Sequence, residues 1–261
     1  MQRNQLLSLG FFLALFLVLY LGCDTKSKEH KLGEKSRVQN FERINIDRLL
    51  RDGRPALPVD AKTALMDMEQ VLSRAETDSL KVKTMKSMAS LWYANEQPLI
   101  SGFYAEKIAE VEASARAWNI AGTTYSLAAK QLKDENERLH AIDKSREALE
   151  NALSIDPASV DSKINLALTY VDAPLEDNPM KGILMLVQLN KEQPENIPVL
   201  MQLGRLSLKT GQIDKAVARL TKVIELRPSF RQAHCLLAEV YQKKGDTGLA
   251  QKEQNICDTL K

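Results

Sequence analysis

The segment IPVLMQLGRLSLKTGQIDKAVARLTKVIELRP, from Ile197 to Pro228, decides the fold. Apolar residues recur at three- and four-residue spacing on both sides of Gly211, and Pro228 closes the second stretch. This spacing predicts an amphipathic helix on each side of the glycine, and proline cannot continue a helix. The segment therefore predicts two antiparallel helices joined by a tight turn.

The same pattern recurs along the chain. Pro194 and Pro228, which close two successive units, are 34 residues apart. Four further stretches share a small residue three places before an aromatic one. They are Trp118-x-x-Ala121-Gly122-x-x-Tyr125, Leu166-Ala167-x-x-Tyr170, Leu237-Ala238-x-x-Tyr241 and, as a weaker copy, Met88-Ala89-x-x-Trp92. Matching small, apolar and proline positions at a fixed period predict a stack of repeated helix pairs.

This pattern resembles that of tetratricopeptide repeat (TPR) proteins, most strongly from Asp161 onward. The resemblance implies an all-α fold, a right-handed α-solenoid of four clear units and a degenerate fifth. The expected units span about 82–114, 115–159, 160–196, 197–230 and 231–261, and residues 41–81 are expected to form extra N-terminal helices.

Two local expectations follow from the helix pairs. Helices approach closely where side chains are small, so Gly204 is expected to face Ala216. Asn178 and Pro179 are typical of a helix cap and a first helical residue, so they are expected to begin the helix that follows.

The N-terminus is expected to be a targeting signal covering residues 1–22. A basic residue precedes an almost unbroken apolar run, Leu6–Leu21, and a small residue follows it, which is the composition of a secretory signal. The segment resembles the lipobox of bacterial lipoproteins, which implies cleavage before Cys23 and acylation of its thiol. Tyr20 stands where such signals usually carry leucine. The alternative is a signal anchor that is never cleaved.

Residues 23–40 are mostly polar and are expected to form a flexible tether between the lipidated Cys23 and the helical body. The body is then expected to lie outside the cytoplasm, in the periplasm, at a membrane that the sequence does not specify.

The composition argues against several functions. The 36 basic and 34 acidic residues are interspersed, which gives no clustered basic face for nucleic acid. No Ser/His/Asp set, glycine-rich phosphate loop or metal-ligand spacing stands out, so we expect neither an enzyme nor a metal or cofactor site. His140 and His234 are far apart in sequence and are expected to be packed or surface residues.

Cys235 and Cys257 are expected on the two helices of one unit. They could pair if their Cα atoms lay within about 7 Å. Their register places them about one helical turn out of step, so we expect two free, half-buried thiols.

The first helices of successive units are expected to line a concave surface that binds a partner. The mixture of apolar and amide side chains there suits a peptide or helix laid in a groove. The expected groove residues are Asn119, Thr123, Ile164, Asn165, Leu168, Met201, Gln202, Arg205, Cys235 and Glu239.

These features predict a membrane-anchored interaction scaffold of the bacterial cell envelope, whose partner is an envelope protein or peptide. The alternative is a TPR chaperone subunit of an envelope maturation pathway, such as cytochrome c biogenesis, held by an uncleaved anchor. A third hypothesis, an enzyme within residues 41–115, has no catalytic set to support it.

Overall fold

The computed structural model describes residues 44–260. The signal segment, Cys23 and the tether lie outside these residues. From Leu49 onward the described residues form one compact unit, and the helix that begins at Ile46 leads into it.

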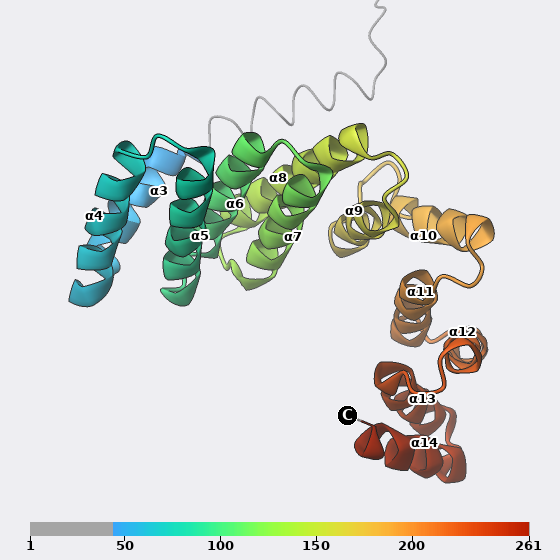
Figure 1. Ribbon diagram of the computed structural model, residues 1–261. Helices are drawn as coiled ribbons and strands as arrows, with labels where there is room; N and C mark the ends of the chain where they lie inside the picture. The colour runs from blue at the N-terminus through green and yellow to red at the C-terminus, as the bar shows by residue number, and fades with distance from the viewer. Residues whose placement is uncertain (1–43, 261) are drawn as a thin grey trace, which may run out of the picture. The chain divides into compact units, whose positions relative to one another are not determined.

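The described residues form helices and no strands, which confirms the all-α prediction. Five helix pairs follow a short N-terminal group (Figure 1). The N-terminal group is α3 (Ile46–Gly53), the 3-10 turn η1 (Arg54–Ala56) and α4 (Val59–Ser73). The pairs are α5 (Asp78–Ala94) with α6 (Pro98–Glu112), α7 (Ala115–Gln131) with α8 (Glu135–Ile155), α9 (Val160–Asp172) with α10 (Lys181–Glu192), α11 (Ile197–Lys209) with α12 (Ile213–Leu226), and α13 (Arg231–Lys244) with α14 (Thr247–Thr259).

From α4 onward, each helix packs against the next along the chain. Further contacts link α7 with α9, α6 with α8 and α11 with α13, so neighbouring pairs also touch. This is a solenoid of helical repeats, in which a pair cannot bury its apolar face without its neighbours.

Most helices begin at a side-chain cap. A side-chain oxygen accepts a hydrogen bond from the N–H three residues later, which satisfies a donor that the first turn leaves free. The capping residues are Asn45, Thr77, Ser114, Asp134, Ser159, Asn196 and Asp246. At the other end of α13, Gly245 has φ of 85°, a left-handed conformation that suits glycine.

Paired helices approach each other closely at glycines, and a leucine side chain packs against two of these glycines. A Cβ on Gly204 would lie 2.9 Å from Leu220 Cδ2, and one on Gly122 would lie 2.5 Å from Leu149 Cγ. The atoms nearest to a Cβ on Gly204 all belong to Leu220, and the expected contact between Gly204 and Ala216 stays a prediction. The leucine one turn after Ala216 fills the space that the glycine leaves.

The start of α10 also differs from the prediction. The helix begins at Lys181, after Met180, and the carbonyl of Asn178 accepts the Lys181 N–H at 3.2 Å. Asn178 and Pro179 thus belong to the turn before the helix. Asparagine and proline are favoured in turns for the same reasons that they are favoured at helix starts, so the pair alone does not distinguish the two.

Candidate partner-binding trough and the terminal disulfide

Two of the expected groove residues lie in the core. Ile164 and Met201 are each only 5% exposed. Ile164 packs with Leu186 of α10 and Leu203 of α11, and Met201 belongs to the cluster that joins α11, α12 and α13. Both side chains fill the space between repeats and are unavailable to a partner.

Three other expected residues meet at the seam between α7 and α9. The Asn165 amide donates to the Asn119 side-chain oxygen at 3.0 Å, and the Thr123 hydroxyl donates to the Asn119 carbonyl at 3.0 Å. These polar groups form hydrogen bonds with one another, and they link α7 and α9, the first helices of two neighbouring pairs. The remaining expected residues are dispersed: Leu168 and Gln202 are half-buried, while Arg205 and Glu239 are exposed.

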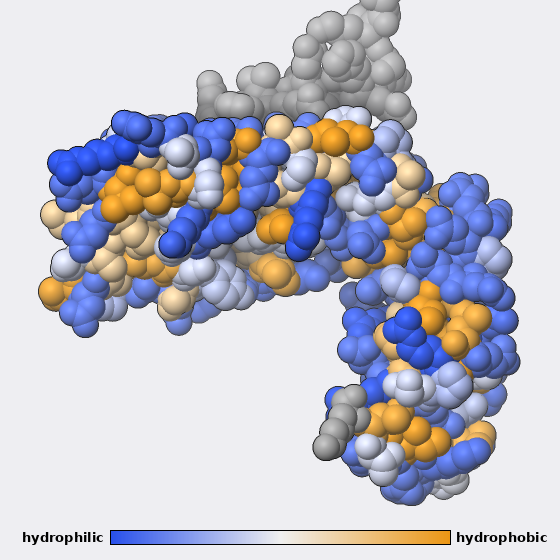
Figure 2. Space-filling view, in the orientation of Figure 1, coloured by the Kyte–Doolittle hydropathy of each residue, from blue (hydrophilic) through white to orange (hydrophobic). Residues whose placement is uncertain are grey.

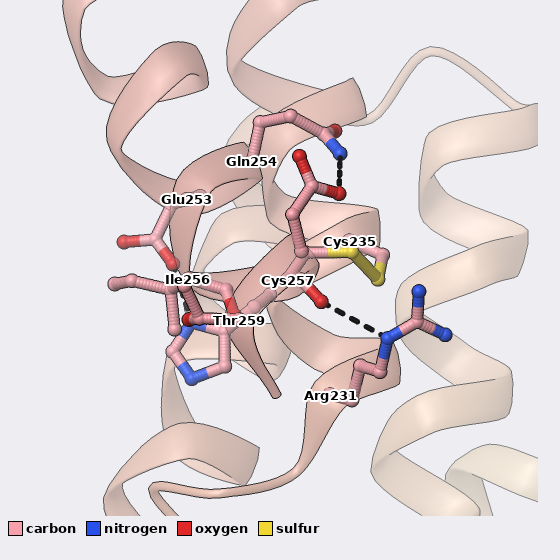
Figure 3. Close-up of a disulfide and its surroundings, with 9 residues drawn as sticks. Arg231, Cys235, Glu253, Gln254, Ile256, Cys257 and Thr259 are labelled. Atoms are coloured by element: carbon pink, nitrogen blue, oxygen red, sulfur yellow. Dashed lines mark hydrogen bonds and ion pairs between the residues drawn. A yellow bond between two sulfur atoms is a disulfide. The ribbon is translucent and has the colours of Figure 1, made fainter. Parts of the chain in front are cut away.

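The prediction of free thiols at Cys235 and Cys257 is wrong, because the two form a disulfide with a Cα–Cα distance of 5.1 Å (Figure 3). The turn between α13 and α14 consists of only Gly245 and Asp246. Cys235 lies ten residues before Gly245 and Cys257 eleven after Asp246, so the two are level to within about one residue, a rise of about 1.5 Å.

A hollow that the sequence analysis missed lies along α5 and α6. It has a volume of about 880 Å³ and is lined by α5 from Asp78 to Ser90 and by the end of α6. A second hollow of about 230 Å³ continues between α5, α6 and α7. The two share Lys86, Ser90 and Glu112, and together we call them the α5–α7 trough.

Small side chains line the inner part of the trough. Its surface there is mainly apolar and includes Ile108 and Ile120 beside alanines and hydroxyls. The small residues are Ala89, Ser90, Ser101, Ala105, Ala117 and Thr124. Small side chains leave room for a large one, so this part of the trough is suited to receive a bulky apolar side chain from another molecule.

Large apolar residues stand exposed on the helices that flank the trough. Ile120 is 49% exposed and Leu127, two turns later on α7, is 52% exposed. Tyr93 of α5 is 47% exposed, and its hydroxyl accepts a hydrogen bond from Gln131 of α7 at 2.9 Å. Figure 2 shows apolar surface interspersed with polar side chains over this part of the molecule. On α7, Ile120 points away from the face that carries the buried Ala117 and Ala121. This position in the helical period was the sequence signal that Ile120 faces outward.

The charges of the trough are mostly paired. Lys86 Nζ lies 3.1 Å from Glu112 across the trough, and Asp78 lies 3.1 Å from Lys81. Lys83 is exposed and has no ion pair among residues 44–260. The trough therefore offers one unmatched cation beside an apolar hollow.

A further hollow, of about 400 Å³, lies between α7, α8 and α9. Its charged residues are already matched, since Lys130 lies 2.9 Å from Asp172 and Arg138 forms two hydrogen bonds with Glu135. A charged ligand would have to displace these partners, so the α5–α7 trough is the better candidate.

The carboxylate of Glu106 links α6 to two neighbouring helices, α7 and α8. The Tyr125 hydroxyl donates to Glu106 at 2.6 Å, and Lys144 donates to the other oxygen of Glu106 at 2.9 Å. Burial, together with the Glu106 charge, raises the pKa of Tyr125, which keeps its hydroxyl protonated as a donor. One carboxylate thus joins α6, α7 and α8.

Comparison with known proteins identifies one part of the chain. A family model described as TPR repeat matches residues 204–245, from the second half of α11 through α13. This stretch is a tetratricopeptide repeat. The TPR segment thus contains the α11–α12 turn at Gly211 from which the repeat pattern was recognised.

Solved structures of MamA are similar in fold to the chain. MamA from residue 41 to its end, of Desulfovibrio magneticus RS-1, is 14% identical with a TM-score of 0.46, over 69% of this chain and 94% of that chain. MamA of AMB-1 is 20% identical with a TM-score of 0.40, over 70% of this chain and 92% of that chain. No curated protein matches the sequence.

Within residues 44–260, no helix has the length and apolar character needed to cross a membrane. Across the same range, no group of three or more His, Cys, Asp and Glu side chains is arranged to hold a metal ion.

Proposed function

We propose that this chain is a membrane-anchored interaction scaffold of the bacterial cell envelope that holds a segment of another protein in the α5–α7 trough. The observation that carries the proposal is the hollow lined by small side chains and by the exposed Ile120, with Leu127 exposed two turns later on the same helix. Exposed apolar side chains beside a cavity are a common feature of protein-binding surfaces.

The partner's chemistry follows from the lining. A bulky apolar side chain would fill the space above Ala105 and Ala117, and an acidic group would complement Lys83. A helix or extended peptide with an apolar anchor and a nearby acidic residue has both features.

The cellular location rests on two observations. The apolar run ending at Gly22-Cys23 is typical of a lipoprotein signal, which would leave Cys23 acylated. The Cys235–Cys257 disulfide supports the same location, because disulfides persist mainly in oxidising compartments outside the cytoplasm.

The trough is tested by a pair of variants matched in residue type and exposure. Ile120 and Ile155 are both isoleucines and both 49% exposed, but Ile155 lies at the end of α8 and does not line the trough. Ile120→Asp is expected to abolish crosslinking of an envelope protein to a photoreactive residue at Ser90, and Ile155→Asp to leave it intact. Equal crosslinking in both variants would rule out the trough as the binding site.

The anchor is tested separately by mass spectrometry of the mature N-terminus and by fractionation of cells. We expect an acylated Cys23 at the N-terminus, and we expect Cys23→Ser to prevent acylation and cleavage. A wild-type chain that retains residues 1–22 with an unmodified Cys23 would instead support the uncleaved anchor.

A further inference from the structure

The Cys235–Cys257 disulfide joins the last two helices at a place that solvent reaches from one side. Cys235 of α13 is half-buried, whereas Cys257 of α14 is only 4% exposed. An incoming thiol would therefore meet the Cys235 sulfur first.

Little apolar burial holds α14 against α13. Cys257 is the one buried residue of α14, and Leu249 in its first turn is 38% exposed. By contrast, α13 buries Ala233, Leu237 and Val240 in the core. In α14 the disulfide cysteine is thus the one buried side chain, whereas α10 buries Leu186 and Leu189 and α12 buries Leu220 and Val223.

The other links between the two helices that we identify are polar. Arg231 Nε donates to the Cys257 carbonyl at 2.9 Å (Figure 3). The ring of His234 lies between Glu253, 2.6 Å from Nδ1, and the Pro228 carbonyl, 2.9 Å from Nε2. The contacts of Arg231 with Cys257 and of His234 with Glu253 hold only while α14 stays in place.

Arg231 lies beside the disulfide. It precedes Cys235 by four residues on α13, which places both on one helix face, and its side chain reaches the backbone of Cys257. A guanidinium next to a cysteine stabilises the thiolate form. Arg231 is therefore placed to stabilise the sulfur that leaves when the bond is broken.

We propose that Cys235–Cys257 is an exchangeable disulfide, which a small dithiol reduces in the folded protein and whose reduction releases α14 from α13. The thiolate of the dithiol attacks Cys235 Sγ and forms a mixed disulfide. The Cys235–Cys257 bond breaks and its electron pair leaves on Cys257, whose thiolate then takes up a proton.

The second thiol of the reductant completes the exchange. It loses its proton and attacks the reductant's own sulfur in the mixed disulfide, which expels Cys235 as a thiolate that is then protonated. Two electrons and two protons pass to the protein, and the dithiol becomes a cyclic or intramolecular disulfide. Re-oxidation by a disulfide of the same class reverses the sequence and restores α14.

The test uses the full chain and dithiothreitol as the dithiol, in buffer without denaturant. Alkylation followed by peptide mapping counts the thiols at Cys235 and Cys257 separately from Cys23, and hydrogen exchange reports on each helix. We expect both thiols to become alkylated, with faster exchange in α14 and unchanged exchange in α5 to α12. Reduction only at the rate of global unfolding, or unchanged exchange in α14 after reduction, would overturn the proposal.

Two variants separate the role of the Arg231 charge from simple packing. Arg231→Ala is expected to slow reduction about threefold, since exchange depends on the stability of the leaving thiolate, and Arg231→Lys is expected to retain most of the rate. A similar slowing in both variants would show that the charge has no role.

The double variant Cys235→Ala/Cys257→Ala should show fast hydrogen exchange in α14 without any reductant. A protected α14 in that variant would contradict the release step.

Discussion

At the scale of single residues, Gly182 and Gly248 form a natural comparison, because each is the second residue of its helix. A Cβ on Gly182 would lie 2.3 Å from the Ala167 carbonyl oxygen of α9, whereas the nearest atom to a Cβ on Gly248 lies 3.8 Å away. We expect Gly182→Ala to lower the free energy of unfolding by about 1–3 kcal/mol. Gly248→Ala should leave it unchanged or raise it by up to about 1 kcal/mol. Denaturant unfolding followed by circular dichroism measures both, and equal effects would contradict the close approach of α9 and α10.

A second residue-scale prediction concerns pH. Burial lowers the pKa of His140 below its ordinary value of 6.5, and the Lys144 cation lowers it further. The carboxylates of Asp143, Glu106 and Glu147 oppose this shift without cancelling it. The folded protein thus binds a proton at His140 less readily than the unfolded chain, so the free energy of unfolding falls as the pH drops through about 6.5.

The measurement for His140 is unfolding at a series of pH values. His140→Gln should flatten the slope of the free energy of unfolding between about pH 7 and 5, by well under the 1.4 kcal/mol per pH unit of a complete proton because the side chain is partly exposed. Above about pH 8 the histidine is neutral in both states, so the slopes of the two proteins should agree there. An unchanged slope in the variant would assign the pH dependence to other groups.

The identity of a residue does not show whether its side chain lies on the binding surface or in the core. Ile164 and Met201 occupy the positions on their helices that suggested a groove, yet they are buried between repeats. An apolar residue suits either place, and only the packing of the next helix decides between them. Ile120 was missed although its phase on α7 indicates an outward-facing residue, because that phase does not show that a hollow between α5, α6 and α7 lies beside it.

At the scale of helices, the end of α9 is held by a residue from α8. Arg146 donates to the Thr169 carbonyl, which also accepts the Ala173 N–H, and to the Ala173 carbonyl, which lies beyond the last turn of α9. Its guanidinium also lies 4.4 Å from the centre of the Tyr170 ring, and Lys181 Nζ lies 3.9 Å from the same ring. Two cations from neighbouring helices thus contact one aromatic ring.

Replacing Arg146 should lower the free energy of unfolding more than replacing Lys181. Arg146→Met removes hydrogen bonds to partly buried carbonyls and should cost about 1–3 kcal/mol, with faster hydrogen exchange at the end of α9. Lys181→Met removes only the contact with the ring and should cost about 0.5–1 kcal/mol. Thermal unfolding and hydrogen exchange measure both, and equal losses would show that Arg146 does not cap α9.

The helix pairs could be foreseen because their signals are local and repeated. Asp134 begins α8 with the capping hydrogen bond typical of that position, and Gly211 and Gly245 mark two turns with positive φ. What could not be foreseen depends on contacts between helices. The leucine opposite Gly204 and the pairing of Cys235 with Cys257 follow from how two helices sit against each other, which the periodicity of each helix leaves open.

At the scale of the whole helical array, the helix pair should be the unit of stability. The cluster that includes Leu220 and Val223 of α12 and Leu237 of α13 shows how one pair is buried by the next. Because contacts run mainly between neighbours, loss of a terminal pair should leave the remaining pairs folded. A cut within a pair should have a different effect, since it leaves one helix without the partner that buries its apolar face.

This difference can be measured with two truncations. A chain ending at Arg227 lacks α13 and α14 but keeps α11 and α12 together, so we expect α3 to α12 to remain helical and to unfold cooperatively. The surface that α13 covered, including Val223, then becomes exposed and should promote self-association at high concentration. A chain ending at Gln212 keeps α11 and its contacts with α9 and α10 but lacks α12. The face of α11 that α12 covers, including Leu208, is then exposed, so α11 should lose protection from hydrogen exchange. If the chain ending at Arg227 were unfolded throughout, or if α11 stayed protected without α12, the helix pair would not be the unit of stability in this protein.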